Sequence, residues 1–470
     1  MDIKELYSIF VKCGSVATDS RAIRGGELFF ALKGENFDGN EYAVNLEELF
    51  FALKGENFDG NEYAVKALEA GAAYAVVNAD APVAGKADCY PSENGGSRII
   101  KVDDTLAQLQ ALARYHRENV LGEGNHLTVI GITGTNGKTT TKELLRTVLS
   151  AGLRTVATEG NLNNDIGVPL SLLKITPDTQ IAIIEMGASH PDDIAKLVKV
   201  SEPDYGIITN VGKAHLLGFG SFEGVKKAKG RLYDYVNEFG KAVFVNQNDE
   251  VLRSMCAERE GLSIVPYGLN TDGSTILETT SESPFLRIKL SDGKVINTSL
   301  IGNYNSANVL AALCVGKFFG ISEDKALAAI ASYRPSNSRS QMVRTERNSL
   351  IVDAYNANPS SMRAALMNFF SINASPKAVL LGDMRELGDG SVNEHKEILK
   401  LLSGAGIDRI YLVGEEFRKA LEDSVRPENV SWFATSAELA DELAHNPFSG
   451  YTALVKGSRG IQMEKTIPSL

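Results

Sequence analysis

The residues best suited to chemistry lie in the segment GTNGKTT (134–140), which follows an apolar run and opens an amphipathic stretch. Glycines let backbone N–H groups close around phosphate oxygens, and the N-terminus of the next helix favours anions. In this pattern a lysine neutralises the β- and γ-phosphates and a threonine holds Mg²⁺. The general G-x-x-x-x-G-K-T spacing is broken because Ile132 occupies its first glycine position. We interpret the segment as a variant phosphate loop formed by Gly134, Thr135, Asn136, Gly137, Lys138, Thr139 and Thr140.

Three polar side chains further along the chain are candidates for a metal site. Glu185 closes the apolar run that begins at Ile181, where a carboxylate lies near bound phosphates and supplies the oxygen ligands that Mg²⁺ prefers. His215 follows the next apolar run, so it is expected at the same sheet edge. Lys229 lies in a basic helical stretch, and from the residues alone a solvated charged face is its simpler interpretation.

The elements around these residues alternate between apolar runs and amphipathic stretches, which predicts parallel sheets with helices on both faces. Residues near 263–300 differ and predict a small antiparallel excursion. A polar segment near 334–341 indicates a second boundary. We expect an α/β protein of three domains, covering residues 1–104, 105–333 and 334–470. The predicted buried strands are Val129–Thr133, Ile181–Glu185, Gly206–Thr209, Ala242–Asn246, Leu350–Asp353, Ala378–Leu381, Arg409–Val413 and Ala453–Lys456.

The N-terminal part contains a perfect duplication, because Glu27–Val44 and Glu48–Val65 have the same sequence. Solenoid repeats diverge and need several copies to bury a core, so a single copy indicates an accidental duplication instead. We expect one copy to fill the strand position and the other to form an extruded surface loop or a displaced edge strand. The sequence leaves open whether Lys33-Gly34 or Lys54-Gly55 faces a ligand.

Composition excludes several classes of protein. The formal net charge of −11 over 470 residues argues against a nucleic-acid partner held through its phosphates. The chain lacks an apolar run long enough to span a membrane, and its first residues do not resemble a signal peptide. The four cysteines are widely scattered, which favours neither a disulfide framework nor a zinc site. A reducing cytoplasm fits best.

Taken together, the motifs resemble the Mur ligase superfamily over essentially the whole chain. The segments that carry the resemblance are GTNGKTT (134–140), IIEMGASHPDDI (183–194), TNVGKAHLLGFGS (209–221), GNYNSANVLAA (302–312), DAYNANPSSM (353–362), LGDMRELG (381–388) and VKGSRGIQME (455–464). The N-terminal segment TDSRAIRGGELFFALKGENFDG (18–39) also fits the nucleotide-sugar domain of that family. The resemblance implies a small α/β UDP-binding domain, a central P-loop ATPase domain with a parallel sheet and a C-terminal Rossmann-like domain.

The resemblance also implies roles for individual residues. Lys138 and Thr139 would hold ATP and Mg²⁺, Glu185 a metal ion, and His215 a second Mg²⁺. Lys229 would carry CO₂ as a carbamate whose oxygens face that second ion. The adenine and interdomain nucleotide positions correspond to Asn305, Asn308, Arg339 and Asp353. Substrate-binding positions correspond to Ser20, Arg21, Asn356, Asn358, Lys456, Ser458 and Arg459.

The implied activity is ATP-dependent ligation of D-alanyl-D-alanine to UDP-N-acetylmuramoyl-tripeptide through an acyl phosphate, in peptidoglycan synthesis, by a monomer. Lys138, His215 and Lys229 are the expected catalytic residues. Two alternatives stay open at this point. One is another amide ligase of the superfamily that adds an amino acid. The other is a P-loop switch that binds ATP without ligation. A switch does not require a second metal site, so His215 and Lys229 distinguish the two.

Overall fold

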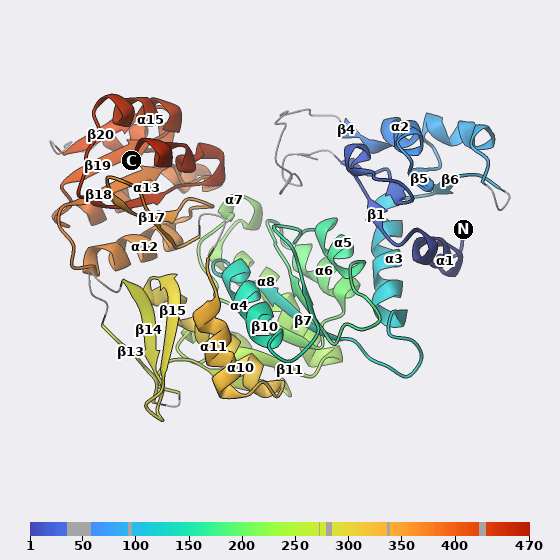
Figure 1. The fold of residues 1–470 in the computed structure, drawn as a ribbon, viewed down its shortest axis with the longest axis horizontal. Coiled ribbons are helices and arrows are strands. Elements are labelled where there is room, and N and C mark those ends of the chain that lie inside the picture. The colour runs from blue at the N-terminus through green and yellow to red at the C-terminus, as the bar shows by residue number, and fades with distance from the viewer. Residues whose placement is uncertain (35–57, 93–95, 272, 279–283, 336–338, 423–428) are drawn as a thin grey trace.

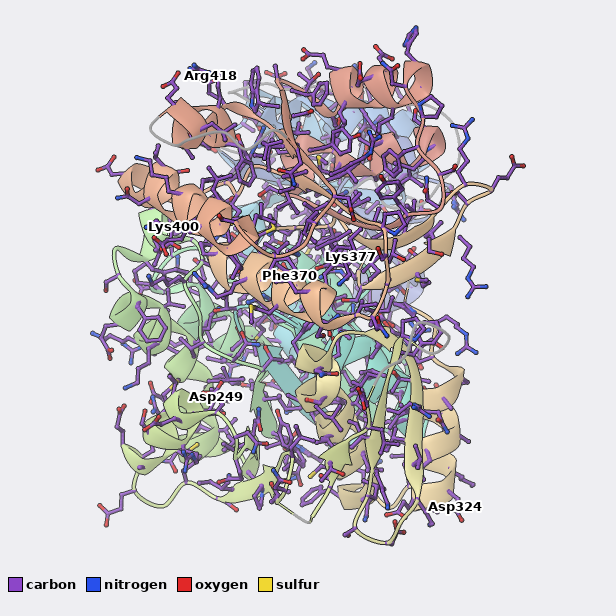
Figure 2. The ribbon with its side chains drawn as sticks, turned by 90° about the vertical axis from the view of Figure 1, so that its left-hand side faces the viewer. Asp249, Asp324, Phe370, Lys377, Lys400 and Arg418 are labelled. Carbon is purple, nitrogen blue, oxygen red and sulfur yellow. The ribbon has the colours of Figure 1, made fainter. Side chains whose placement is uncertain are left out.

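The computed structural model describes residues 1–34, 58–92, 96–271, 273–278, 284–335, 339–422 and 429–470. Over these ranges the chain forms three units, each built on a mainly parallel sheet (Figure 1). The N-terminal and C-terminal units stand on opposite sides of the view, with the central unit below and between them. In the turned view of Figure 2 the C-terminal unit lies directly above the central one. The predicted α/β class is confirmed.

The central sheet has the strand order β12-β11-β10-β7-β9-β8, and all neighbouring strands in it are parallel. Its inner strands coincide with apolar runs, because strands covered by helices on both faces bury nearly every side chain. The four predicted central strands are confirmed to within one residue. The strands are β7 (Thr128–Thr133), β8 (Thr155–Ala157), β9 (Ile181–Glu185), β10 (Tyr205–Ile208), β11 (Ala242–Asn246) and β12 (Ile264–Tyr267).

Helices cover both faces of this sheet (Figure 1). They are α3 (Thr105–Asn119), α4 (Lys138–Leu149), α5 (Gly167–Leu172), α6 (Asp193–Ser201), α7 (Leu216–Phe219), α8 (Phe222–Phe239), α9 (Glu250–Ala257), α10 (Ser306–Phe318) and α11 (Glu323–Ser332). In the described ranges of the whole chain, the structure contains no helix that combines the length and the apolar character needed to cross a bilayer.

The antiparallel excursion is confirmed in part. Strands β13 (Thr275–Ile276), β14 (Phe285–Lys289) and β15 (Val295–Ile301) form a separate antiparallel sheet. The segment 264–267, which we expected in that excursion, instead joins the central sheet in parallel as β12 beside β11. As the edge strand of that sheet, β12 is only partly buried.

The C-terminal sheet has the order β16-β17-β21-β18-β19-β20, with only the β16–β17 pair antiparallel. Its strands are β16 (Gln341–Arg344), β17 (Ser349–Asp353), β18 (Lys377–Gly382), β19 (Arg409–Val413), β20 (Val430–Phe433) and β21 (Thr452–Lys456). Its helices are α12 (Pro359–Ser371), α13 (Ser391–Leu402), α14 (Glu415–Glu422) and α15 (Ser436–His445). The four strands predicted here are confirmed to within one residue.

The N-terminal unit has a parallel sheet of order β1-β2-β5-β6 that includes the duplicated sequence. The first copy supplies β2 (Leu28–Phe30) and β3 (Lys33–Gly34), whereas the second supplies β4 (Phe58–Asp59) and the start of α2 (Ala64–Glu69). The remaining elements are α1 (Ile3–Cys13), β1 (Val16–Ala17), β5 (Tyr74–Asn78) and β6 (Ile99–Val102).

Strands β3 and β4 pair antiparallel, with Lys33 opposite Asp59 and Gly34 opposite Phe58. This pairing joins the upstream half of one copy to the downstream half of the other. The predicted extruded copy, and Lys54-Gly55 with it, falls in residues 35–57, outside the described residues. The sheet position expected for a single copy is therefore filled by Leu28–Phe30.

Candidate functional site

The phosphate loop lies between the end of β7 and the start of α4, at the carboxyl edge of the central sheet. Two lysines from different helices donate to the same backbone oxygen in it. Lys138 Nζ lies 2.8 Å and Lys229 Nζ 3.0 Å from the carbonyl oxygen of Gly134. Gly134 and Lys229, which lie 95 positions apart in the chain, are thus brought together.

Glycine is required at two loop positions. Gly134 has φ +146°, and a Cβ there would lie 1.9 Å from Thr209 Oγ1. Gly137 has φ +80°, and its Cβ would lie 2.8 Å from Asn308 Oδ1. Because both positions combine a left-handed backbone with a close neighbour, a larger residue would displace the loop from the helix N-terminus.

Glu185 lies at the end of β9 with its carboxylate buried against the loop. Its Oε1 accepts hydrogen bonds from Thr139 Oγ1 at 3.2 Å and from Asn163 Nδ2 at 2.9 Å. A threonine hydroxyl beside a carboxylate oxygen is the type of donor set that Mg²⁺ takes together with water and phosphate oxygens. Thr139 and Glu185 therefore fit the first predicted ion. Thr140 occupies the first turn of α4 behind them.

His215 and Lys229 line one small cavity together with the loop residues Gly134, Thr135 and Lys138. His215 has a left-handed backbone with φ 50°, and its Nδ1 forms a close ion-pair contact with Glu386 of the C-terminal unit. Among the described residues, three or more His, Cys, Asp or Glu side chains do not converge on one point. The predicted second metal site needs no such cluster, because the carbamate of Lys229 would supply the oxygen ligands of the ion.

The electrostatics of Lys229 suit that modification. Its side chain is 3% exposed, and burial together with the charge of Lys138 holds its pKa well below the ordinary value. The pKa of Lys138 is also lowered, mainly by burial. The negative charge of Glu185 opposes this effect, and the positive charge of Arg339 adds to it. A lysine with a depressed pKa has a larger neutral fraction at neutral pH, and the neutral amine is the form that adds to CO₂.

The predicted adenine-side residues support the loop from behind. Asn308 Oδ1 accepts a hydrogen bond from Thr141 Oγ1 at 3.0 Å, and its Nδ2 donates to Asn305 Oδ1 at 2.9 Å. Asn305 in turn donates to the carbonyl of Ile301 at 2.8 Å. Both asparagines are buried, so their amide groups are oriented by the protein itself.

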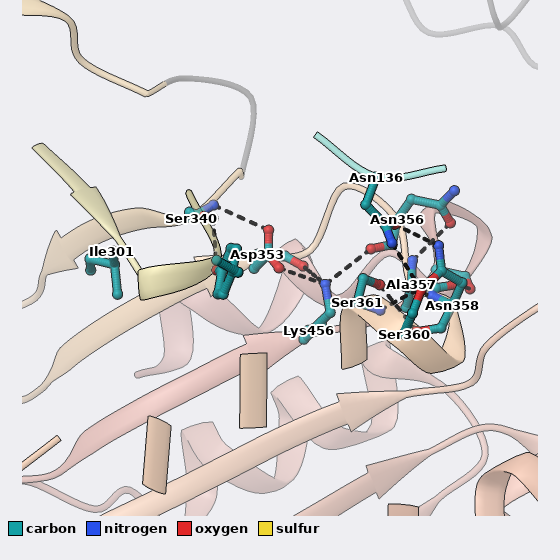
Figure 3. Close-up of polar contacts among 12 residues, drawn as sticks. Asn136, Ile301, Ser340, Asp353, Asn356, Ala357, Asn358, Ser360, Ser361 and Lys456 are labelled. Carbon is teal, nitrogen blue, oxygen red and sulfur yellow. Dashed lines mark hydrogen bonds and ion pairs between the residues drawn. The ribbon is translucent and has the colours of Figure 1, made fainter. Parts of the chain in front are cut away.

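A ring of three side chains joins the loop to the C-terminal unit (Figure 3). Asn358 Nδ2 donates to Asn136 Oδ1 at 2.8 Å, and Asn136 Nδ2 donates to Ser360 Oγ at 2.9 Å. Ser360 Oγ donates to Asn358 Oδ1 at 2.8 Å, which closes the ring. The same Asn358 oxygen accepts the backbone N–H of Ser361 and caps α12. Both the nitrogen and the oxygen of the Asn358 amide are thus hydrogen-bonded.

A second polar group of the C-terminal unit surrounds Asp353 at the end of β17 (Figure 3). Lys456 Nζ lies 2.5 Å from Asp353 Oδ2 and 3.3 Å from the carbonyl of Asn356. Asp353 Oδ1 accepts the backbone N–H of Ser340 at 3.2 Å. Because β17 and β21 are neighbours in register, Asp353 and Lys456 meet directly. Lys456 is 1% exposed, so its charge is neutralised inside the unit.

Two arginines flank Tyr355. The guanidinium carbon of Arg339 lies 3.5 Å from the centroid of the Tyr355 ring, and that of Arg459 lies 5.1 Å from it. The Nε of Arg339 is buried, with no hydrogen-bond partner among the described residues. Ser458 donates from Oγ to the carbonyl of Ala357 at 3.3 Å. These predicted residues therefore gather on one side of the C-terminal unit.

Ser20 and Arg21 lie elsewhere, in a short helical turn of the N-terminal unit. Arg21 Nη2 forms an ion pair with Asp19 at 2.7 Å, and its side chain is 63% exposed. An exposed guanidinium is available to an anionic ligand, but the pairing with Asp19 must be shared or exchanged when one binds. Figure 1 places this unit apart from the C-terminal one, so the predicted substrate residues form two separate groups.

Several residues of the site were missed from the sequence. Asn163, Ser360, Tyr355 and Glu386 contact predicted residues directly. Lys142 lies one helical turn after Lys138 and is completely buried. The sequence signal for it is a lysine on the apolar face of α4. A buried lysine needs a counter-charge, so Lys142 indicates a buried acidic partner.

Models of known protein families match most of the chain. The Mur ligase middle domain matches residues 132–316, the Mur ligase glutamate ligase domain residues 338–459, and the Mur ligase family catalytic domain residues 47–117. With the full-length relatives below, these matches show that the chain belongs to the Mur ligase family.

Within that family, the similarity is to the MurF type. The UDP-N-acetylmuramoyl-tripeptide–D-alanyl-D-alanine ligase of Bacillus subtilis is 33% identical, over 97% of this chain and 92% of the relative. The ligase of the same name from Escherichia coli is also 33% identical, over 99% and 95%. A crystal structure of MurF from Acinetobacter baumannii matches with a TM-score of 0.78 and 29% identity, over 97% of this chain and 93% of that one.

Proposed function

We propose that this chain joins D-alanyl-D-alanine to the terminal carboxyl group of UDP-N-acetylmuramoyl-tripeptide at the expense of ATP, forming the pentapeptide precursor of peptidoglycan. Its membership of the Mur ligase family and its likeness to MurF over the full chain support this activity. The structural observation that carries the proposal is the cavity in which Lys138, His215 and Lys229 meet beside the phosphate loop.

The reaction requires a carboxylate to become an electrophile. The γ-phosphoryl group of ATP passes to a carboxylate oxygen of the tripeptide, which gives an acyl phosphate and ADP. The amine of D-alanyl-D-alanine then attacks the acyl carbon, the amide bond forms, phosphate leaves and the amine loses a proton. Lys138 and the loop N–H groups stabilise the transferring phosphoryl charge, and the protein contributes mainly positioning.

We propose that two Mg²⁺ ions offset the repulsion among triphosphate, carboxylate and nucleotide sugar when they are bound. Thr139 and Glu185 would hold one ion, and His215 with the carbamate of Lys229 the other. The neutral amine of Lys229 adds to the carbon of CO₂, a proton leaves, and the side chain gains two oxygen atoms. The lowered pKa of Lys229 and its burial support this assignment.

We assign residues 1–104 to UDP-sugar binding through Ser20 and Arg21, residues 105–333 to ATP, and residues 334–470 to closing the site over the acceptor. Asn305, Asn308, Arg339 and Asp353 would complete the nucleotide site. Asn356, Asn358, Lys456, Ser458 and Arg459 would face the acceptor side. We further propose a cytoplasmic monomer, in keeping with four free cysteines among which no disulfide forms.

The proposal is tested by measuring ADP release from ATP with UDP-N-acetylmuramoyl-tripeptide, with and without D-alanyl-D-alanine, while peptide product is followed by mass spectrometry. We expect ADP release to depend on both substrates and to match product formation. A rate of ADP release that does not depend on either substrate would contradict ligation and favour a P-loop switch. Replacing the tripeptide by a shorter precursor and a single amino acid tests the amino-acid-adding alternative.

A further inference from the structure

Two buried charges face each other beneath the phosphate loop. Lys142 is 0% exposed, and its Nζ lies 3.8 Å from Glu185 Oε2 and 3.1 Å from Glu143 Oε1. Neither Lys142 Nζ nor Glu185 Oε2 has a partner in hydrogen-bonding geometry among the described residues. Burying a charge is costly unless an opposite charge accompanies it. Lys142 and Glu185 thus form a buried pair of opposite charge, with the partly exposed Glu143 beside it.

The position of Lys142 on α4 explains why an apolar residue would be expected there. It follows Lys138 by four residues, so both side chains project from the same side of the helix. Its neighbours Thr141, Leu144 and Leu145 are buried as well. The ammonium group in this layer approaches two carboxylates, that of the partly exposed Glu143 and that of the buried Glu185.

The two oxygens of Glu185 consequently have different surroundings. Oε1 is oriented toward Thr139 and Asn163, which donate to it. Oε2 faces the ammonium group of Lys142. The attraction between these opposite charges opposes rotation of the carboxylate, so its other oxygen stays directed at Thr139, where the proposed first Mg²⁺ would bind.

We propose that Lys142 is a positioning residue that fixes the Glu185 carboxylate for Mg²⁺–nucleotide binding. This inference rests on the proposed function, because it assigns Glu185 to the metal. Outer-shell partners of metal ligands are worth about 10–100-fold in metal affinity. A lysine that serves only to stabilise the fold would change thermal stability and leave the Mg²⁺ dependence as it is.

The test measures the melting temperature of the full chain with ADP over a titration of MgCl₂, and the readout is the Mg²⁺ concentration that gives half of the ADP-induced shift. For Lys142→Met we expect this concentration to rise about 10–100-fold. For Lys142→Arg, which keeps the charge with a different reach, we expect a smaller rise of a few fold. A value within twofold of the wild type in either variant overturns the proposal.

Lys377 provides a matched control. It is also a buried lysine, 8% exposed, and its Nζ donates to the carbonyl of Phe370 at 3.0 Å in the C-terminal unit (Figure 2). We expect Lys377→Met to lower the melting temperature without moving the Mg²⁺ midpoint. If Lys142→Met does not fold, Lys142→Arg decides the question alone. A wild-type chain that shows no ADP-induced shift at any Mg²⁺ concentration would instead contradict the proposed function.

Discussion

Asn358 donates a hydrogen bond of 2.8 Å to Asn136, which lies 222 positions earlier in the chain. One residue belongs to the phosphate loop of the central unit and the other caps α12 of the C-terminal unit. Ser360 contacts both and completes the ring (Figure 3). Any movement of the C-terminal unit therefore changes the surroundings of the loop that is proposed to bind ATP.

This ring predicts that Ser360→Ala weakens the connection between the units. The bond from Asn136 to Ser360 is the one that crosses between the units, and a hydrogen bond is worth about 1 kcal/mol, so we expect about a fivefold fall in kcat/KM for D-alanyl-D-alanine. Water should also reach the acyl phosphate more easily, and the ratio of ADP released to peptide formed should rise above one. Both quantities are measured in the same assay.

Ser361→Ala is the control for this variant. Ser361 Oγ donates to the carbonyl of Asn358 at 3.1 Å and so supports the cap of α12. Its contacts stay within the C-terminal unit. We expect its loss to reduce stability by about 1 kcal/mol and to leave the ADP-to-peptide ratio unchanged. Equal ratios in the two variants would argue against the connection.

Lys229 leads to a second prediction. In Lys229→Ala the carbamate cannot form, so we expect activity to fall nearly to background because the proposed second Mg²⁺ loses its oxygen ligands. Short carboxylates such as acetate or formate, added to the assay, should restore part of it. Lys227→Ala removes an exposed charge from the same basic stretch and should have little effect. Full activity of the Lys229→Ala protein would reject the carbamate role.

The duplication gives a third prediction. A chain without residues 45–65 has the same sequence as one without residues 36–56, because the two copies are identical. In that chain Lys33 and Gly34 would meet Asp38 and Phe37 across a short hairpin, in place of Asp59 and Phe58. We expect full activity and a melting temperature equal to or above that of the complete chain, since a shorter loop costs less entropy to close. Lower activity or stability would mean that the duplication contributes to the fold.

His395 gives a prediction about pH. Its Nε2 accepts the backbone N–H of Met384 at 3.0 Å and its Nδ1 donates to the carbonyl of Ser391 at 2.7 Å, so it is held neutral and buried. Burial lowers its pKa, although Asp383 and Glu416 act in the opposite direction. Below pH about 6.5 the unfolded chain takes up a proton at this residue and the folded chain resists it. The C-terminal unit should therefore lose stability as the pH falls from 7 to 5.

Trp432 makes this measurable. It is the single tryptophan of the chain, and its Nε1 donates to the carbonyl of Gly414 at 2.7 Å within the C-terminal unit. Urea unfolding followed by its fluorescence at pH 7.5 and pH 5.5 reports on that unit. We expect His395→Gln to be less stable at pH 7.5 but to lose less on acidification. An equal loss in both proteins would show that other groups carry the pH dependence.

The hydrogen bonds of both ring nitrogens to the backbone also leave His395 unsuited to act as a general base.

Much of this architecture could be predicted from the sequence because strands covered on both faces are nearly continuous apolar runs. Ile181–Glu185 and Arg409–Val413 were placed correctly for that reason. The segment 264–267 was assigned to the wrong sheet, because it lies in the chain next to the segments that form the antiparallel sheet. Whether a strand joins one sheet or another depends on tertiary contacts that local patterns do not encode.

In the site, too, local segments could be predicted from the sequence and tertiary contacts could not. Gly134 and Lys138 could be assigned because one short segment contains the whole phosphate loop. The partners of Asn136 could not, because Asn358 and Ser360 come from another unit and their meeting depends on how the units dock. The role of Lys142 could not be predicted for a different reason, because a lysine in a helix is usually exposed and its burial shows only in the structure. The roles of these residues in catalysis stay predictions.

The pairing of Lys33–Gly34 with Phe58–Asp59 has a practical consequence. It holds Gly34 and Phe58 next to each other, so the number of residues between them can change without shifting the register of these two strands. Loop closure entropy grows only slowly with length, and sites of this kind tolerate insertions. A fluorescent reporter or an affinity tag could therefore replace residues 36–56 and follow this enzyme in living cells without disturbing its catalytic units.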